Sequence, residues 1–255
     1  MKIFIFLSYI LTGFLVHTQN PESPPDLRSR AGRIQNPESE MVNPSDYLSD
    51  LKTELQKEWP KNRTVNIVFH GHSVPAGYFK TPQVNTMGAY PNLFMKKLKE
   101  IYPYAVVNVI VTAIGGENSV KGAERFESDV LIHKPDVILI DYALNDRGVG
   151  LEKAYLAWNN MIKLAKTKNI KVILLTPSPD QNVNLADSTN VLKKHTDQII
   201  QLAKENQVAL VDSYKAFEFL YSDKEKLASY MSQVNHPNEL GHELIANEIM
   251  KWFKQ

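Results

Sequence analysis

Residues 65–73 read Val65-Asn66-Ile67-Val68-Phe69-His70-Gly71-His72-Ser73, an apolar run that ends in a glycine and a serine. A nearly continuous run of β-branched and aromatic side chains is typical of a strand buried on both faces of a parallel sheet. Ser73 would follow such a strand directly, with its hydroxyl over the edge of the sheet. A glycine shortly before a serine is also typical of an ordinary turn, so the importance of Ser73 depends on the rest of the chain.

Four more apolar runs follow this first one, and segments with helical spacing separate them. The further strands are expected at 106–111, 136–140, 171–175 and 209–211, and the helices at about 90–101, 119–133, 151–168, 187–206 and 239–254. Strands that alternate with helices of this length predict βαβ units. We therefore expect an α/β fold, a three-layer α/β/α sandwich with a five-stranded, mostly parallel central sheet. In such sheets, binding sites lie outside the carboxyl ends of the strands.

The N-terminus has the pattern of a secretory signal peptide. Met1 and Lys2 precede an uncharged apolar run from Ile3 to Val16, which is short for a transmembrane helix and ends in polar residues. We expect residues 1–18 to be a signal peptide; an uncleaved anchor and a buried helix are the alternatives. The expected location is secreted or periplasmic, with no stable membrane association after cleavage.

Residues 19–44 predict a flexible linker because they are rich in Pro, Ser, Asn and charge and carry no apolar face. The folded domain is expected to span residues 45–255. It would open with a helix whose apolar residues recur at helical spacing until Pro60 stops it: Tyr47, Leu48, Leu51, Leu55 and Trp59.

Composition narrows the functional classes. The chain has 255 residues, enough to bury a large core without disulfides or metals. Its 29 Lys and Arg against 28 Asp and Glu leave a formal net charge of +1, which gives no electrostatic reason to expect a nucleic-acid partner. The absence of cysteine excludes thiolate catalysis and cysteine-ligated zinc.

Polar groups follow two other strands at the same expected edge. Gly115 and Gly116 come after the second strand, where backbone N–H groups could face an oxyanion. Asn145 follows the third strand, and its side-chain amide could donate to the same developing charge. Each feature alone is equally compatible with a tight turn or a helix cap.

A histidine precedes the last helix. His236 lies in a loop and is followed by Pro237, which restricts the backbone next to it. A histidine held in this way is well placed to act as a general base. A surface or structural histidine is the plainer interpretation, so the argument for His236 comes from the set of residues.

Together, these features resemble the SGNH hydrolase superfamily of GDSL-like lipases and esterases. The resemblance extends from about Val65 to Phe253 and is carried by four blocks: Gly71-His72-Ser73, Ile114-Gly115-Gly116, Leu144-Asn145-Asp146, and Asn235-His236-Pro237-Asn238 with Gly241-His242. It implies a flavodoxin-like SGNH fold, no metal and no cofactor. It also implies Ser73 as the nucleophile, His236 as its base, and the Ser73 N–H, the Gly116 N–H and Asn145 as the oxyanion hole.

Two positions depart from the family pattern. The usual Gly-Asp-Ser is Gly71-His72-Ser73, and the usual Asp three residues before the histidine is Gln233. Gln233 could orient the imidazole but cannot stabilise its charge as a carboxylate does. Three explanations are open: a Ser73–His236 dyad oriented by a carbonyl oxygen, another acid such as Glu239 or Asp146, or lost catalysis. We favour one of the first two because the Ser, Gly, Asn and His are all present.

The expected function is an exported serine esterase that removes acyl groups, and specifically acetyl groups, from carbohydrate esters. Its partner would be a small-molecule or polysaccharide ester. One alternative is a secreted GDSL-type lipase or lysophospholipase. Another is a non-catalytic carbohydrate-binding protein that stacks sugars on its loop aromatics, Tyr78, Phe79, Tyr90 and Tyr142. A third is a metal hydrolase that uses the imidazoles of His70, His72, His236 and His242.

Overall fold

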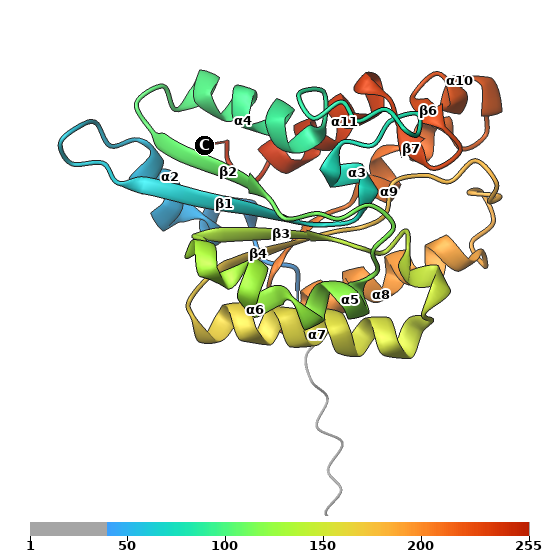
Figure 1. Ribbon diagram of the computed structural model, residues 1–255, viewed down its shortest axis with the longest axis horizontal. Helices are drawn as coiled ribbons and strands as arrows, with labels where there is room; N and C mark the ends of the chain where they lie inside the picture. The colour runs from blue at the N-terminus through green and yellow to red at the C-terminus, as the bar shows by residue number, and fades with distance from the viewer. Residues whose placement is uncertain (1–39, 255) are drawn as a thin grey trace, which may run out of the picture. The chain divides into compact units, whose positions relative to one another are not determined.

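The computed structural model describes residues 40–254, and Figure 1 shows their arrangement. The predicted signal peptide and most of the predicted linker lie outside these residues. Met41 and Val42 are already partly buried against the core of the domain. Within residues 40–254, no helix combines the length and the apolar character that crossing a membrane requires.

Strands and helices alternate along the chain, as the apolar runs predict. The strands are β1 (Thr64–Gly71), β2 (Val106–Val111), β3 (Val137–Asp141), β4 (Lys171–Leu175), β5 (Ala209–Val211), β6 (Met231–Gln233) and β7 (His236–Pro237). The α-helices are α1 (Pro44–Tyr47), α2 (Ser49–Leu55), α3 (Ser73–Ala76), α4 (Tyr90–Ile101), α5 (Ser119–Glu124), α6 (Phe126–Asp129), α7 (Leu151–Thr167), α8 (Val191–Asn206), α9 (Ser213–Ala216), α10 (Lys224–Ala228) and α11 (Glu239–Met250). Short 3₁₀ turns are η2 (Leu131–His133), η3 (Asp146–Gly148) and η4 (Glu218–Leu220).

The central sheet has five strands in the order β2-β1-β3-β4-β5, and every neighbouring pair is parallel. This is the flavodoxin-like order, in which the chain reverses its winding direction between β1 and β3. Ligands bind such sheets at that reversal, outside the carboxyl ends of the strands. Gly71 pairs with Asp141 there, so the residues that follow β1 and β3 lie side by side.

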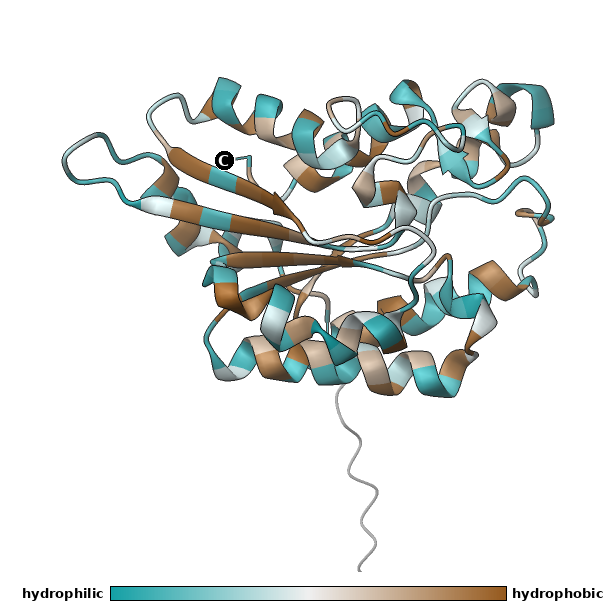
Figure 2. Ribbon diagram, in the orientation of Figure 1, coloured by the Kyte–Doolittle hydropathy of each residue, from teal (hydrophilic) through white to brown (hydrophobic). Residues whose placement is uncertain are grey.

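Helices cover both faces of the sheet, which gives the expected three layers. In Figure 1, α4 and α11 lie above the sheet, while α5, α6, α7 and α8 lie below it. One core contains apolar residues of α2, α4 and α11, and the other contains those of α7 and α8. Figure 2 shows the strands as mostly apolar ribbons between helices of mixed hydropathy. The two cores hold the strand ends, and the loops beyond them, in fixed positions.

One strand is less buried than its sequence predicts. β2 resembles the other apolar runs in sequence, but Val106 and Val111 are exposed because β2 is an edge strand. All five residues of β3 are buried, since β3 lies in the middle of the sheet. Apolar composition alone does not distinguish these two positions.

The expectation of one helix from Tyr47 to Trp59 is wrong. Leu48 leaves helical geometry, with φ −109° and ψ 19°, and separates α1 from α2. α2 ends at Leu55, and the side chain of Trp59 is 84% exposed. The residue before a proline is disfavoured in the helical region, so Pro60 helps to end the helix upstream of Trp59.

Candidate active site

Ser73 stands at the start of α3, immediately beyond β1, and is 8% exposed. Gly71 allows this sharp turn because a Cβ atom there would lie 2.5 Å from the Asp141 carbonyl oxygen and 2.7 Å from Pro75 Cγ. The His72 N–H donates to the same carbonyl at 3.2 Å, which ties the turn to the end of β3. The local sequence therefore fixes the serine at the winding reversal of the sheet.

His236 reaches Ser73 from the loop before α11. The side-chain oxygen of Asn238 caps this helix by accepting from the N–H groups of Leu240 and Gly241, at 3.0 and 3.3 Å. This cap sets the start of the helix and thereby the position of the preceding loop. The His236 Nε2 atom lies 2.8 Å from the Ser73 Oγ atom. A hydroxyl and an imidazole separated by 163 positions thus meet at hydrogen-bond distance, as a nucleophile and its base must.

The other ring nitrogen of His236 faces a backbone carbonyl. The Phe79 oxygen lies 3.0 Å from Nδ1, and a carbonyl can only accept, so Nδ1 carries the proton. Nε2 is then unprotonated and able to accept the proton of the Ser73 hydroxyl. Burial lowers the pKa of His236, and the Phe79 carbonyl partly offsets this effect. The ring is therefore held neutral, in the tautomer that a general base requires.

The side-chain amide of Gln233 also touches Nδ1. Its nitrogen lies 2.5 Å away, while its oxygen accepts from the Thr81 N–H at 3.1 Å. An amide nitrogen and a protonated Nδ1 are both donors, so this orientation conflicts with the Phe79 contact. A glutamine amide can turn by 180°, and its O and N atoms are assigned from the surrounding hydrogen bonds. We therefore assign the tautomer from the Phe79 carbonyl, which can only accept; turning the Gln233 oxygen towards Nδ1 would give up its bond from the Thr81 N–H.

The acids that the sequence offers as replacements are engaged elsewhere. Asp146 accepts from the Ser119 N–H at 2.8 Å and from the Trp158 indole at 2.6 Å. Glu239 accepts from the Asn85 side chain at 3.0 Å. Within residues 40–254, no carboxylate contacts His236. The expectation of a borrowed acid at either position is therefore wrong, and the dyad with a carbonyl oxygen fits the geometry.

Two backbone N–H groups beside Ser73 have no acceptor within residues 40–254: those of Gly116 and of Ser73 itself. Gly116 has φ +79°, a conformation that side chains disfavour. Asn145 is half-buried, and its amide nitrogen donates to the Glu117 carbonyl at 2.8 Å. That bond uses one of the two amide protons and leaves the second for a ligand. The loops that follow β1, β2 and β3 thus each carry an N–H donor of the kind that an oxyanion hole requires.

A polar network behind the oxyanion loop was not found from the sequence. The Glu117 carboxylate accepts from Arg125 Nε at 2.9 Å and from the Tyr142 hydroxyl at 2.7 Å. The same hydroxyl lies 3.1 Å from His70 Nε2. Because the carbonyl of Glu117 accepts from Asn145, the network holds two parts of the oxyanion site together. The only sequence signal is the charge of Glu117 directly after Gly116.

His72, the residue that departs from the family pattern, forms a second imidazole contact. Its Nδ1 accepts from the Val74 N–H at 3.2 Å and lies 3.4 Å from Ser73 Oγ. Its Nε2 lies 3.4 Å from the Asp141 carboxylate, which also accepts from the Tyr90 hydroxyl at 3.0 Å. Both His72 and Asp141 are buried. The buried Asp141 carboxylate therefore lies beside His72 and not beside His236.

Three of the four aromatics considered for sugar stacking cannot serve that purpose. Phe79, Tyr90 and Tyr142 are buried, and Tyr142 packs edge-on against His70 at 5.2 Å. Tyr78 alone is half-buried beside the site, with its ring 6.4 Å from that of His236. Stacking of sugars on this set is therefore wrong as an expectation, because most of its members fill the core.

The four histidines of the metal interpretation lie in different surroundings. His70 contacts Thr112 at 2.9 Å and packs on Phe126, whereas His242 accepts from the Tyr90 N–H at 3.2 Å and packs on Phe79. Burial lowers the pKa of His70 to about 4 and that of His242 to about 3. Among the described residues, no three His, Asp or Glu side chains are grouped as metal ligands.

Comparison with known families agrees with this geometry. The family model of GDSL-like lipases and acylhydrolases matches residues 69–244, more than half of the chain. The chain belongs to this family. It is therefore a carboxylic ester hydrolase with the SGNH fold, and the resemblance seen in its sequence is confirmed.

Individual relatives of this GDSL-family protein are distant. An acetylxylan esterase of Geobacillus stearothermophilus is 23% identical over 167 residues, which cover 60% of this chain and 75% of that enzyme. The crystal structure of Axe2, an acetylxylan esterase of the same organism, has a TM-score of 0.65 at 20% identity, covering 75% of this chain and 94% of that one. A two-domain esterase active on acetylated mannans has a TM-score of 0.68 at 20% identity; it matches 82% of this chain, which spans only 52% of that one. At these identities the solved structures establish the fold alone.

Proposed function

We propose that the protein removes acetyl groups from carbohydrate esters, with Ser73 as nucleophile and His236 as base. The observation that carries the proposal is the 2.8 Å contact between Ser73 Oγ and His236 Nε2, next to unpartnered N–H groups. A hydroxyl beside a neutral imidazole and an oxyanion site are the groups that acyl transfer to serine requires.

The reaction would proceed through an acetyl-serine. His236 takes the proton of Ser73 as Oγ attacks the ester carbonyl, and the oxyanion accepts from the Ser73 and Gly116 N–H groups and from Asn145. The carbonyl then reforms, the bond to the sugar oxygen breaks, and His236 protonates that oxygen. Water then attacks the acetyl-serine while His236 takes its proton. The bond to Ser73 Oγ breaks, His236 returns the proton to Oγ, and acetate is released.

The Phe79 carbonyl takes over the orienting role of the missing carboxylate. It accepts from Nδ1–H and so selects the reactive tautomer, but it carries only a partial negative charge. It therefore stabilises the imidazolium of His236 less than a carboxylate would. We infer a working enzyme in which His236 is correctly oriented as a base, while its imidazolium form is incompletely stabilised.

The position of the Tyr78 ring favours a small acyl group as the substrate. The ring of Tyr78 lies 3.0 Å from the point that a Cβ atom of Gly115 would occupy, so the ring closes over the loop that carries Gly116. The same ring approaches His236 from the other side. A long acyl chain would have to displace it. The names of the two relatives, an acetylxylan esterase and an esterase active on acetylated mannans, support acetyl groups on a glycan as the substrate.

The first test is release of acetate from acetylated xylo- and manno-oligosaccharides, together with labelling by a serine-directed phosphonate. We expect turnover and a single phosphonate adduct on Ser73 in the wild type. Ser73→Ala should lose the adduct and at least about 10⁴-fold in kcat/KM. A protein that binds the glycans without reacting with the phosphonate would be a carbohydrate-binding protein, and the proposal would be wrong.

The acyl preference has its own test in Tyr78→Ala. Removing the ring opens space beside Gly115, so the ratio of kcat/KM for butyrate over acetate esters should rise about tenfold. Tyr104→Ala, at an exposed position before β2 and so at the opposite end of that strand from Gly115, is the matched control and should leave the ratio unchanged. A wild type that prefers long acyl chains would favour a GDSL-type lipase instead.

We also propose that the enzyme acts outside the cytoplasm, on the basis of the apolar run from Ile3 to Val16. Expression of the full chain should yield a protein shortened at its N-terminus in the exported fraction, as mass spectrometry would reveal. Retention of the full-length protein in the cytoplasm would contradict this location without affecting the proposed chemistry.

A further inference from the structure

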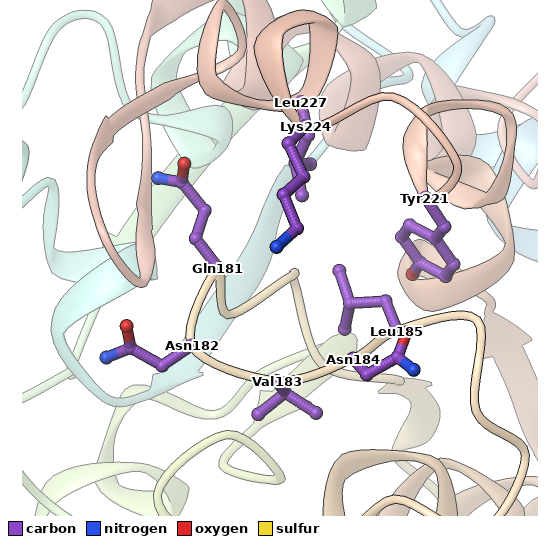
Figure 3. A pocket seen from close by; sticks show the side chains of 8 residues that line it. All are labelled: Gln181, Asn182, Val183, Asn184, Leu185, Tyr221, Lys224 and Leu227. Carbon is purple, nitrogen blue, oxygen red and sulfur yellow. The ribbon is translucent and has the colours of Figure 1, made fainter.

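A cavity of about 470 Å³ lies beside the loop that carries His236, between residues 181–185 and α10. Figure 3 shows its lining, in which carboxamides, a lysine and a tyrosine are combined with leucines. This size and mixture are typical of a pocket that binds a small polar ligand.

Hydrogen bonds connect the cavity to the loop that carries His236. The Gln181 N–H donates to the Val234 carbonyl at 2.9 Å, and the Gln181 side chain donates to the Gln233 carbonyl at 3.3 Å. Val234 and Gln233 lie two and three residues before His236. A glycan whose acetyl group is at Ser73 could therefore extend past this loop into the cavity.

The floor of the cavity is preformed. Leu185 and Leu227 are buried beneath it, and the Tyr221 hydroxyl is fixed by donating to the Tyr214 carbonyl. The rings of Tyr214 and Tyr221 also pack edge-on, with centroids 5.0 Å apart. An ordered floor of this kind lets a ligand bind without first ordering the protein.

Two polar groups of the lining have no protein partner within residues 40–254. The Lys224 ammonium forms no hydrogen bond or ion pair there, and Figure 3 shows it directed towards the loop of residues 181–185. The Asn182 carboxamide is likewise unpaired, because only its backbone N–H is used, by Asp180 at 2.9 Å. Other lysines of the domain, such as Lys121 and Lys251, are paired with glutamates.

We propose that this cavity binds a carboxylate-bearing sugar, a uronic acid unit of the acetylated glycan. The carboxylate would accept a charge-assisted hydrogen bond from Lys224, and the Asn182 amide would bind a neighbouring hydroxyl. This inference rests on the proposed function, since it assumes that the ester at Ser73 is carried by a glycan.

The test compares an acetylated oligosaccharide that contains a uronic acid with the same compound after reduction of its carboxyl group to an alcohol. The wild type should have a KM about tenfold lower for the acidic form at similar kcat, because the contact is distant from the reacting bond. Lys224→Met should abolish this preference, and 0.5 M NaCl should weaken it. Equal KM values for the two forms in the wild type, or a preference that survives Lys224→Met, would overturn the proposal.

Lys226→Met is the matched control. Lys226 is on the same short helix, but its ammonium lies over the Phe219 ring, 5.1 Å from the centroid, and does not line the cavity. Its replacement should leave both the preference and the hydrolysis of 4-nitrophenyl acetate intact. If the wild type hydrolyses no ester, the proposed function fails; calorimetric binding of the deacetylated acidic and reduced oligosaccharides then still tests the cavity.

Discussion

Two histidines flank Ser73, and their surroundings are opposite in kind. His236 is 2.8 Å from the Oγ atom and faces only a carbonyl and an amide, whereas His72 is 3.4 Å from Oγ and faces the buried Asp141 carboxylate. The carboxyl group thus lies beside the ring that is farther from the Ser73 hydroxyl. Proximity to a carboxylate therefore does not identify the base.

The difference follows from what each ring nitrogen already does. His72 caps α3, so its Nδ1 lone pair accepts from the Val74 N–H and is not available to accept the proton of Ser73. Its Nε2 must then carry the proton, on the side of Asp141, whose carboxylate lies 3.4 Å away without forming a hydrogen bond to it. His236 presents a free Nε2 lone pair to Ser73 because its own proton is on the side of the Phe79 carbonyl. The tautomer set by each backbone contact separates a base from a structural imidazole.

The largest effect should distinguish these two rings. Of the two imidazoles, His236→Ala removes the one with a free acceptor and should lower kcat/KM by about 10⁴ or more. His72→Asn keeps a side-chain acceptor for the cap of α3 and should lower it by no more than about tenfold. Steady-state kinetics on an acetyl ester, with circular dichroism to verify folding, measures both. A larger loss in His72→Asn would reverse the assignment.

A smaller effect should follow from giving His236 the carboxylate it lacks. Gln233→Asp should raise kcat about tenfold, because a full charge stabilises the imidazolium better than the Phe79 carbonyl. Gln233→Asn, which is equal in length and neutral, is the control and should show no gain. Equal rates in the two variants would mean that the carbonyl alone is sufficient.

The pH dependence of kcat/KM tests the partner of His236 in a second way. Burial lowers the pKa of His236, and the base must be neutral, so wild-type kcat/KM should hold as the pH falls through 6.5 and decline only below it. A carboxylate beside the ring raises its pKa, so the acid limb of Gln233→Asp should lie at higher pH than that of Gln233→Asn. If the acid limbs of the two variants coincide, the new carboxylate does not contact the His236 ring.

The smallest effect concerns stability. His70, with a pKa of about 4, and His242, with a pKa of about 3, are buried and neutral, while the unfolded chain takes up protons near pH 6.5. The unfolded state therefore binds more protons below that pH, and the free energy of unfolding should fall by about 1.4 kcal/mol per pH unit for each histidine. Urea titrations from pH 7 to 4.5 measure the slope. His242→Asn should reduce this slope by the contribution of one histidine, about 1.4 kcal/mol per pH unit. An unchanged slope would contradict this account.

Most strands and helices of the fold could be predicted from the sequence. The strands at 106–111, 171–175 and 209–211 and the helix at 90–101 have the bounds that their apolar patterns predict. Burial was less predictable, since β2 and β3 are both mostly apolar and β2 is exposed because it lies at the edge of the sheet. The helix that fails to reach Trp59 ends upstream of a proline, where local backbone preferences outweigh apolar spacing.

The sequence by itself determined which groups could meet, because the carboxyl ends of parallel strands share one edge, and the residues after β1, β2 and β3 follow those ends. Only the tertiary structure decided which groups contact one another: the Phe79 carbonyl contacts His236, Asp141 lies beside His72, and the Glu117 carbonyl accepts from Asn145. The physical reason is that a hydrogen bond depends on atomic positions within a few tenths of an ångström. Residue order along the chain does not specify that geometry for loops packed from distant segments.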